Sequence, residues 1–306
     1  MPVYNQTTVY EFILLGFPGL HTFWLFVFLI LLIIYVVTMF GNLLIIGLVS
    51  STSQLKSPMY IFLTHLSVCD ILISTNVGPN TLRVIASRTC YISALSCDIQ
   101  LYFFGASALI ESALLSVMSY DRYLAICNPL HYAAIMNHTL PHSLAMTCWL
   151  AGFLLSMITE ILIFQLDFCG PNIIDHFFCD LAPLLQLSCS DTKSVEIHVS
   201  VTVMTIVFTQ LLFVIGTYIC IFSSILQLSS TSSRQKVFST CSSHLMVVST
   251  YYGTLIALYV APSRGYSLNL NKMLSLLNTI VTPLCNPIIY SLRNKEIKIA
   301  ISKIYL

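Results

Sequence analysis

The amino-acid sequence predicts an all-α membrane protein, a seven-transmembrane helix bundle with a short amphipathic C-terminal helix. Of its 306 residues 57% are hydrophobic and only 8% are charged, whereas soluble proteins carry about a quarter charged residues. Uncharged stretches recur that are long enough to cross a bilayer, which takes roughly 20 apolar residues. We therefore expect residues 1–306 to form a single domain.

The spans are predicted by seven apolar segments. In chain order they cover about 24–50, 58–82, 98–126, 141–165, 197–226, 237–261 and 270–292. Residues 1–23 remain as a leading tail, 24–292 hold the spans, and 293–306 form the closing tail. Basic residues favour the cytoplasmic side of a membrane, and an extracellular N-terminus places most of them there: Lys56, Arg122, Arg234, Lys236, Arg293, Lys295, Lys298 and Lys303. We expect a multi-pass protein of the plasma membrane.

Prolines mark where some of these helices begin or bend. Pro58 and Pro141 lie at the starts of the second and fourth spans, where a missing N–H costs nothing. Pro283 and Pro287 lie inside the seventh span and should bend it. In the closing tail, isoleucines and lysines recur with the spacing of a short amphipathic helix on the lipid of the inner leaflet: Ile297, Ile301, Ile304, Lys298 and Lys303.

Several classes of function are disfavoured. A net charge of +1 argues against nucleic acid, because phosphate binding needs a clustered basic surface. We find no zinc-binding HExxH, nucleotide loop or nucleophile with its base, and so expect neither an enzyme nor a cofactor. A transporter or channel should contain inverted repeats, and none is visible. A retinal protein would need a lysine within the seventh span, and Lys272 lies too near its end.

The long polar loop between the fourth and fifth spans holds Cys169, Cys179 and Cys189. Cysteines in an oxidising compartment are expected to form disulfides. Cys90 is a further cysteine on the outer side, and the sequence does not name its partner. Asn5 begins a glycosylation sequon in the leading tail, whereas the sequon at Asn137 falls on the cytoplasmic side.

Five motifs carry a resemblance to a known family. Asp121-Arg122-Tyr123 at the foot of the third span, with the seven spans and the outside N-terminus, resembles the rhodopsin-like (class A) G-protein-coupled receptors. The narrower motifs resemble the olfactory (odorant) receptors: EFILLGF (11–17), SPMYIFLTHLSVCD (57–70), SYDRYLAICNPLHY (119–132), KVFSTCSSHL (236–245) and NPIIYSLRN (286–294). This resemblance covers nearly the whole chain, and the departures at Lys56, Ser119 and Cys285 are modest.

The resemblance implies a receptor for a small volatile odorant. It also implies a heterotrimeric G protein of the stimulatory olfactory type as the partner, and a rise in cyclic AMP. It further implies a Cys97–Cys179 disulfide, which leaves Cys169 to pair with Cys189. A metal site at His176, Cys179 and Asp180 is the disfavoured alternative, because a bridged Cys179 has no thiolate to offer.

The Asp121 and Arg122 pair is the candidate G-protein switch. Charges deep in hydrocarbon cost several kcal/mol, so the pair should sit at the membrane boundary. Arg122 can pair with Asp121 at rest and reach toward a partner once released; the alternative is a topology anchor. Three more residues at similar depth, and the last of the triplet, complete the set: Tyr218, His244, Tyr290 and Tyr123.

Asp70 and Glu111 are two acids predicted in mid-membrane, where a carboxylate takes up a proton or finds a cation. With Asn42 and Asn286 they could form a polar cluster that holds water or a sodium ion. A hydrogen-bonded structural network is the equally weighted alternative. Proton translocation would need a relay to both surfaces, which the sequence does not show.

The ligand pocket is expected between the outer halves of spans three, five, six and seven. By resemblance, its lining candidates are Phe104, Gly105, Ala108, Leu109, Ser112, Thr202, Ile206, Tyr252, Leu255, Ile256, Tyr259 and Thr279. Each could instead serve ordinary helix packing. Such a mostly apolar lining suits a small, neutral molecule whose polar group meets Tyr259, Thr202 or Ser112.

Overall fold

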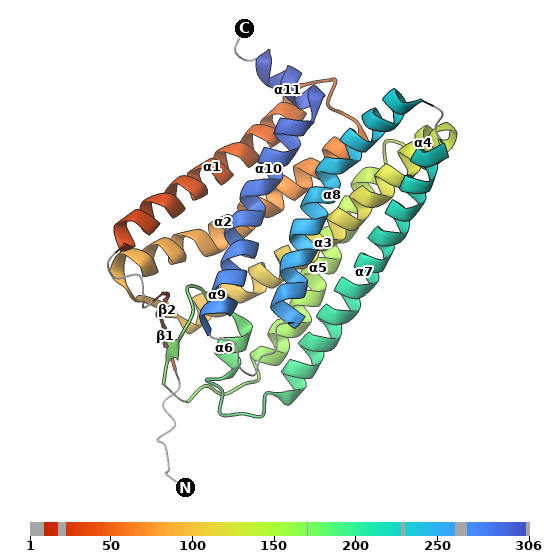
Figure 1. Cartoon of the computed structure of the whole chain (residues 1–306). Helices are drawn as coiled ribbons and strands as arrows, with labels where there is room; N and C mark the ends of the chain where they lie inside the picture. The colour runs from red at the N-terminus through yellow and green to blue at the C-terminus, as the bar shows by residue number, and fades with distance from the viewer. Residues whose placement is uncertain (1–8, 18–22, 170, 228–229, 261–267, 304–306) are drawn as a thin grey trace.

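The computed structural model describes residues 9–17, 23–169, 171–227, 230–260 and 268–303, and its helices form an elongated bundle (Figure 1). Asn5 and Ile304 lie outside the described residues. The prediction of a seven-transmembrane bundle is confirmed. The spans are α1 (Trp24–Ser51), α2 (Pro58–Ser87), α3 (Ala94–Cys127), α5 (Leu140–Ile163), α7 (Lys193–Gln227), α8 (Thr231–Val260) and a seventh built from α9 (Leu268–Leu276), the π-helix η2 (Leu277–Val281) and α10 (Thr282–Arg293).

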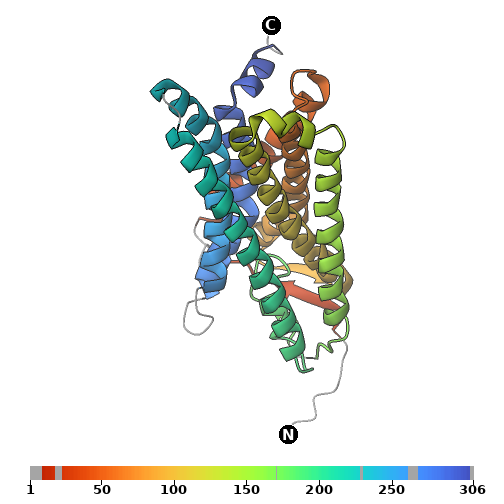
Figure 2. The same ribbon diagram turned by 90° about the vertical axis from the view of Figure 1, so that its right-hand side faces the viewer.

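Six of the described helices are long and apolar enough to cross a membrane, and α8 is not among them. The apolar side chains of α8 nevertheless pack into the main core, where Val247, Val248 and Leu255 are buried. This core also takes side chains from α2, α3, α7 and α10. Packing against these neighbours therefore holds the more polar α8 in the bundle. Figure 2 shows α7 crossing the bundle obliquely to α5.

Several helices extend beyond their predicted ends. The apolar pattern ended the second span near residue 82 and began the third near 98, whereas α2 continues to Ser87 and α3 begins at Ala94. Ser93 caps α3, because its side chain accepts a hydrogen bond from the Ser96 amide at 3.1 Å. Polar residues that flank an apolar run can thus belong to the last turn of one helix, as in α2, or cap the start of the next, as Ser93 does.

The seventh span changes its helical geometry just before Pro283. Proline has no N–H, so Pro283 cannot donate to the carbonyl of the residue four positions earlier. The Thr282 amide bonds instead to Leu277, a five-residue step that defines the π-helix. The predicted bend is therefore accompanied by a π-helix, which inserts one extra residue into the turn. Pro287 lies inside α10, as predicted.

The predicted C-terminal amphipathic helix is present as α11 (Lys295–Ser302). The Asn294 side chain caps it by accepting from the Glu296 and Ile297 amides at 3.0 and 3.3 Å. Ile297 is buried against the bundle and Lys298 is exposed. We call this end of the bundle, with the short helix α4 (Pro129–Ile135), the α11 end (Figure 1).

A three-stranded sheet, which the all-α prediction did not include, covers the opposite end (Figure 2). Its order is β2 (Cys90–Ser93), β1 (Glu11–Leu14), β3 (Ile173–Ile174). β1 pairs antiparallel with β2, Leu14 opposite Cys90, and parallel with β3. Part of the expected leading tail is thus folded between two loops. We call this end, with the short helix α6 (Leu181–Leu185), the sheet end.

Two disulfides hold the sheet end together. Cys97 of α3 is bridged to Cys179, with 5.5 Å between their Cα atoms, and Cys169 is bridged to Cys189 at 5.9 Å. The first disulfide fixes the long loop to α3 across 82 residues of sequence. Cys90 is a free, buried thiol.

We expect Cys97→Ser or Cys179→Ser to lose delivery to the cell surface. Removing a native disulfide costs about 2–5 kcal/mol, and here it releases the loop from α3. Flow cytometry of an N-terminally tagged chain measures the surface fraction, with Cys220→Ser as the control because Cys220 is free and exposed. Normal surface levels of both variants would contradict the expectation.

Candidate functional site

The foot of α3 lies at the α11 end and carries the predicted charge pair. Arg122 Nη2 lies 3.5 Å from Asp121 Oδ2, and the two side chains are 13% and 1% exposed. Tyr132 of α4 donates a hydrogen bond to the other oxygen, Asp121 Oδ1, at 2.8 Å. Burial and the neighbouring Asp121 carboxylate raise the pKa of Tyr132 above its ordinary value, so the phenol keeps its proton. Asp121 is therefore held from two sides.

Tyr132 lies within the quoted motif SYDRYLAICNPLHY, yet the sequence did not reveal its role. The chain leaves α3 at Asn128 and turns into α4 at Pro129, whose fixed φ suits the first helical turn. That turn brings Tyr132 back against Asp121.

A second group at this end joins three spans through His244 of α8. Its Nδ1 lies 2.8 Å from the hydroxyl of Tyr218 in α7, and its Nε2 lies 3.2 Å from the carbonyl of Leu115 in α3. A carbonyl only accepts, so Nε2 carries the hydrogen and Nδ1 accepts from Tyr218. The neutral ring thereby ties α8 to both neighbours.

The remaining predicted switch residues lie close by. Tyr123 packs its ring against Tyr120 at a centroid distance of 6.3 Å. Tyr290 of α10 is buried, and among the described residues its hydroxyl has no hydrogen-bond partner. Among the predicted switch residues, the polar contacts form two groups, one around Asp121 and one around His244.

A polar cluster lies deep in the bundle, where α2, α3 and α10 meet. Asn286 Nδ2 lies 3.0 and 3.1 Å from the two carboxylate oxygens of Asp70 and 3.4 Å from Glu111 Oε1. All three side chains are buried. The cluster brings more acceptors than donors, so a proton or a cation must balance it.

The cluster contains the oxygen ligands that a hard cation such as sodium prefers. Besides the two carboxylates, Asn286 Oδ1 is buried and has no hydrogen-bond partner in the ranges that the structure describes. Among the described residues, however, there is no group of three or more His, Cys, Asp or Glu side chains suited to a metal ion. Asn42 does not join this cluster, because its amide donates to the carbonyls of Thr38 and Pro283 at 3.0 and 3.2 Å.

Three of the predicted ligand residues meet where α3, α7 and α8 converge. The Tyr252 hydroxyl lies 3.4 Å from Gln210 Oε1, 3.4 Å from Ser116 Oγ and 3.5 Å from the Ser112 carbonyl. The adjacent Tyr251 donates to the Ala108 carbonyl at 2.7 Å. Gln210 and Tyr251 were not among the predicted residues.

The other predicted lining residues differ in how far they are buried and in which neighbours they contact. Leu255 is buried, Leu109, Thr202 and Ile206 are half-buried, and Ile256 is 43% exposed. The Phe104 ring packs on Phe178 toward the sheet end. A Cβ at Gly105 would lie 3.0 Å from Ser156 Oγ, so Gly105 faces α5. The side chain of Tyr259 lies outside the described part of the chain.

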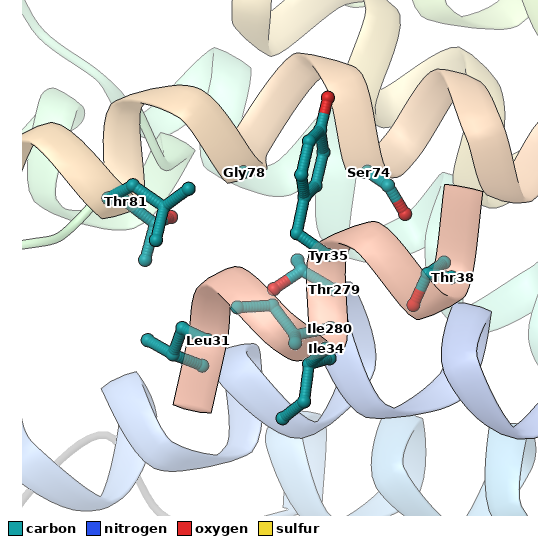
Figure 3. Close-up of a pocket in the computed structure, with 10 residues that line it drawn as sticks. Leu31, Ile34, Tyr35, Thr38, Ser74, Gly78, Thr81, Thr279 and Ile280 are labelled. Carbon is teal, nitrogen blue, oxygen red and sulfur yellow. The ribbon is translucent and has the colours of Figure 1, made fainter. Parts of the chain in front are cut away.

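Thr279 lines a cleft between α1, α2 and η2 (Figure 3). Thr38, Ser74 and Thr81 place further hydroxyls around this cleft. Its cavity volume of about 20 Å³ is room for roughly one water molecule. The Tyr35 ring lies against Gly78, where a Cβ would come within 2.8 Å of it. The cleft is therefore too small for an odorant-sized ligand.

We expect Asn286→Leu to lower stability by about 3 kcal/mol, because it removes the amide donor from two buried carboxylates. Adding Asp70→Asn should recover part of the loss, since it supplies a new amide. The unfolding midpoint Tm of the purified protein measures both effects, with Asn271→Leu as a control in the same span. If Asn286→Leu had the same Tm as the wild type, the prediction that the polar cluster stabilises the bundle would be contradicted.

Comparisons with known proteins agree with the earlier resemblance. A family profile described as "Olfactory receptor" matches residues 31–306. Olfactory receptor 6F1 of Homo sapiens is 44% identical over 96% of both chains. Olfactory receptor 11L1 of Homo sapiens is 45% identical over 98% of this chain and 93% of its own. Olfactory receptor 5P62 of Mus musculus is 45% identical over 98% and 96%. The chain therefore belongs to the olfactory receptors, a family of G-protein-coupled receptors and not of enzymes.

Proposed function

We propose that this odorant receptor lies in the plasma membrane with its N-terminus and sheet end outside the cell. It binds a small, neutral, mostly apolar volatile near the junction of α3, α7 and α8, and it activates a stimulatory olfactory-type G protein at the α11 end, raising cyclic AMP. The observation that carries this proposal is the course of α3, which contacts Tyr251 and Tyr252 at one level and ends in Asp121 and Arg122.

The side chains at the junction suggest the ligand's chemistry. The side chains within hydrogen-bonding distance of the Tyr252 hydroxyl are the Ser116 hydroxyl and the Gln210 amide, both neutral. A charged amine would need a carboxylate at the level of Phe104, and no acid lies there in the sequence. A neutral volatile with one hydroxyl or carbonyl could exchange hydrogen bonds with Tyr252 and pack against Leu255.

Helix α8 offers a route from the ligand to the switch. His244, Val248, Tyr251, Tyr252 and Leu255 follow one helical face by spacings of three and four, and all are buried. A ligand that displaces Tyr252 also biases the position of His244 two turns away, and so its bonds to Tyr218 and Leu115. Ligands shift such an equilibrium by binding the two positions unequally.

The last step is release of Arg122 at the α11 end. In the structure its guanidinium pairs with Asp121, which is also bound by Tyr132. Movement of α8 away from α3 would open a crevice there and free the guanidinium for a helix of the G protein. The lipid of the inner leaflet supports α11 beside this crevice.

The experiment that tests the function expresses the receptor in cells with the olfactory-type G protein and a cyclic AMP reporter. A panel of neutral volatile alcohols, aldehydes, ketones and esters is applied. We expect a concentration-dependent rise with at least one member. A response only to charged amines would contradict the ligand class, and a calcium response without cyclic AMP would contradict the G-protein type.

We expect Arg122→Ala to abolish the odorant-evoked cyclic AMP while surface expression is retained, because the G protein loses its guanidinium contact. Lys298→Ala is a matched control, since it removes an exposed positive charge from α11 at the same end. An unchanged response of Arg122→Ala at equal surface level would remove the switch assignment.

Tyr132→Phe should instead raise the cyclic AMP level without odorant by about tenfold or more, because hydrogen bonds to charged groups contribute about 1.5–3 kcal/mol. Only the hydroxyl that bonds Asp121 is lost. The basal reporter signal, divided by surface level, measures the effect. Tyr91→Phe, on the exposed face of β2, provides the comparison. Equal basal signals in the two variants would mean that Tyr132 does not restrain the resting state.

A further inference from the structure

One buried cation joins three segments that are far apart in the sequence. Lys272, near the start of the seventh span, is 1% exposed. Its Nζ lies 2.5 Å from Asp175 Oδ1 and 2.7 Å from the Gly16 carbonyl oxygen. It also lies 6.0 Å from the centre of the Phe17 ring, within cation–π range. These partners compensate the burial of an ammonium group, so the contact is specific.

The backbone fixes the same segments in register. β1 lies between β2 and β3, and the Gly16 amide donates to the His176 carbonyl at 3.3 Å. Gly16 has a φ of +63°, and a Cβ there would collide with the Val84 side chain. Glycine adopts this conformation without strain, so Gly16 allows the N-terminal segment to lie close against α2.

A chain of aromatic rings runs from this segment to α3. Phe17 stacks on Phe177 at 5.6 Å, Phe177 lies 5.0 Å from Phe178, and Phe178 lies 5.1 Å from Phe104. Phe104 is one of the predicted ligand residues. The N-terminal segment is thus two rings away from the expected ligand site.

His176 fills the space between these rings. Its ring centre lies 4.6 Å from Phe177 and 4.7 Å from Phe178. The ring is buried, and within the described part of the chain neither nitrogen has a hydrogen-bond partner. Burial, with a smaller effect of the Lys272 charge, lowers the pKa of His176 to about 3. Burial raises the pKa of Asp180, 3.9 Å away, to about 6. At neutral pH the uncharged imidazole therefore acts as an apolar packing group.

We propose that residues 11–17 and 173–178 form the roof of the ligand site, and that Lys272 is the positioning residue that clamps this roof to the seventh span. The assignment of the ligand site rests on the proposed function. The clamp does not rest on the proposed function, because it follows from the contacts of Lys272 with the roof and of the roof with Phe104. Since Asp175 is 38% exposed, water can hydrate its carboxylate when Lys272 is replaced, so the variant can fold while the roof loosens.

Cys90 is a built-in reporter of the roof. It is a free thiol that is 3% exposed and pairs with Leu14 across β1 and β2. Thiol modification requires access to the sulfur, and local opening of the covering strand controls that access. The rate at which Cys90 is alkylated therefore measures how often the roof opens.

The experiment treats the purified full-length receptor with a charged maleimide and follows Cys90 modification by site-resolved mass spectrometry. We expect Lys272→Met and Asp175→Asn each to react about tenfold faster than wild type, as loss of a charge-assisted hydrogen bond predicts. Lys193→Met, which removes an exposed lysine at the same end, should react at the wild-type rate. Wild-type rates in both clamp variants would overturn the clamp.

Two further variants guard against simple misfolding. The exchange of charges, Lys272→Asp with Asp175→Lys, should return the rate toward wild type, whereas Gly16→Ala should accelerate it with the ion pair intact. Failure of the exchange to slow the reaction would overturn the specific pairing. These measurements need neither odorant nor G protein, so they stand even if the proposed function fails.

The link from the roof to the ligand site has its own measurement. The panel volatile that gives the largest cyclic AMP response is titrated on Lys272→Met and on Lys193→Met. We expect a several-fold increase in the half-maximal concentration for Lys272→Met alone, with the maximal response kept. Cys90 could react faster in Lys272→Met while the half-maximal concentration of the volatile stays equal to that of Lys193→Met. That result would show that Lys272 holds the roof closed but that the roof is not part of the ligand site.

Discussion

The architecture depends on one constraint, the satisfaction of polar groups on α3 inside an apolar bundle. An unpaired polar group in hydrocarbon costs several kcal/mol, and α3 carries such groups along its whole length. Neighbouring helices pair with α3 side chains: Asn76 with Gln100, Asn286 with Glu111, Thr217 with Ser119, and Tyr132 with Asp121. Three buried donors of these neighbours are satisfied in turn by α3 carbonyls: Ser156 by Tyr102, Tyr251 by Ala108, and His244 by Leu115. These partners lie on α2, α4, α5, α7, α8 and α10. The contacts therefore fix the position of each of these helices along the axis of α3.

The helices could be predicted because long uncharged runs have few structural alternatives. The short strands and the contacts made by the connecting segments could not be predicted. β1 spans four residues, Glu11–Leu14, too few for a reliable alternation of polar and apolar side chains. It exists because β2 and β3 supply partners from distant loops. Tyr132 illustrates the same limit at the other end. Its place in a motif was visible, whereas its contact with Asp121 depends on the turn into α4.

The ligand set was only partly predictable because sequence spacing defines a face of a helix and not the neighbour it meets. Ala108 and Ser112 were expected to line the ligand pocket, and their backbone carbonyls accept hydrogen bonds from Tyr251 and Tyr252 of α8. Gly105 belongs to the same expected face, but the close approach of α5 places Ser156 against it. In the seventh span the π-helix adds one residue to a turn and so rotates what precedes Pro283. Thr279 consequently lines the cleft beside α1 and α2.

The seventh span and α3 are the two elements that connect the proposed roof with the α11 end of the bundle. Lys272 binds the roof at the sheet end, and one π-helix further along the same span Asn286 binds Asp70 and Glu111. A π-helix is rare and is often found at functional sites, and η2 lies between these two anchored parts. Contact between a ligand and the roof would then act on α3 in two ways. One runs through Phe178 and Phe104, and the other through the seventh span and Glu111, and the proposed roof would by these two routes be coupled to rearrangement around α3.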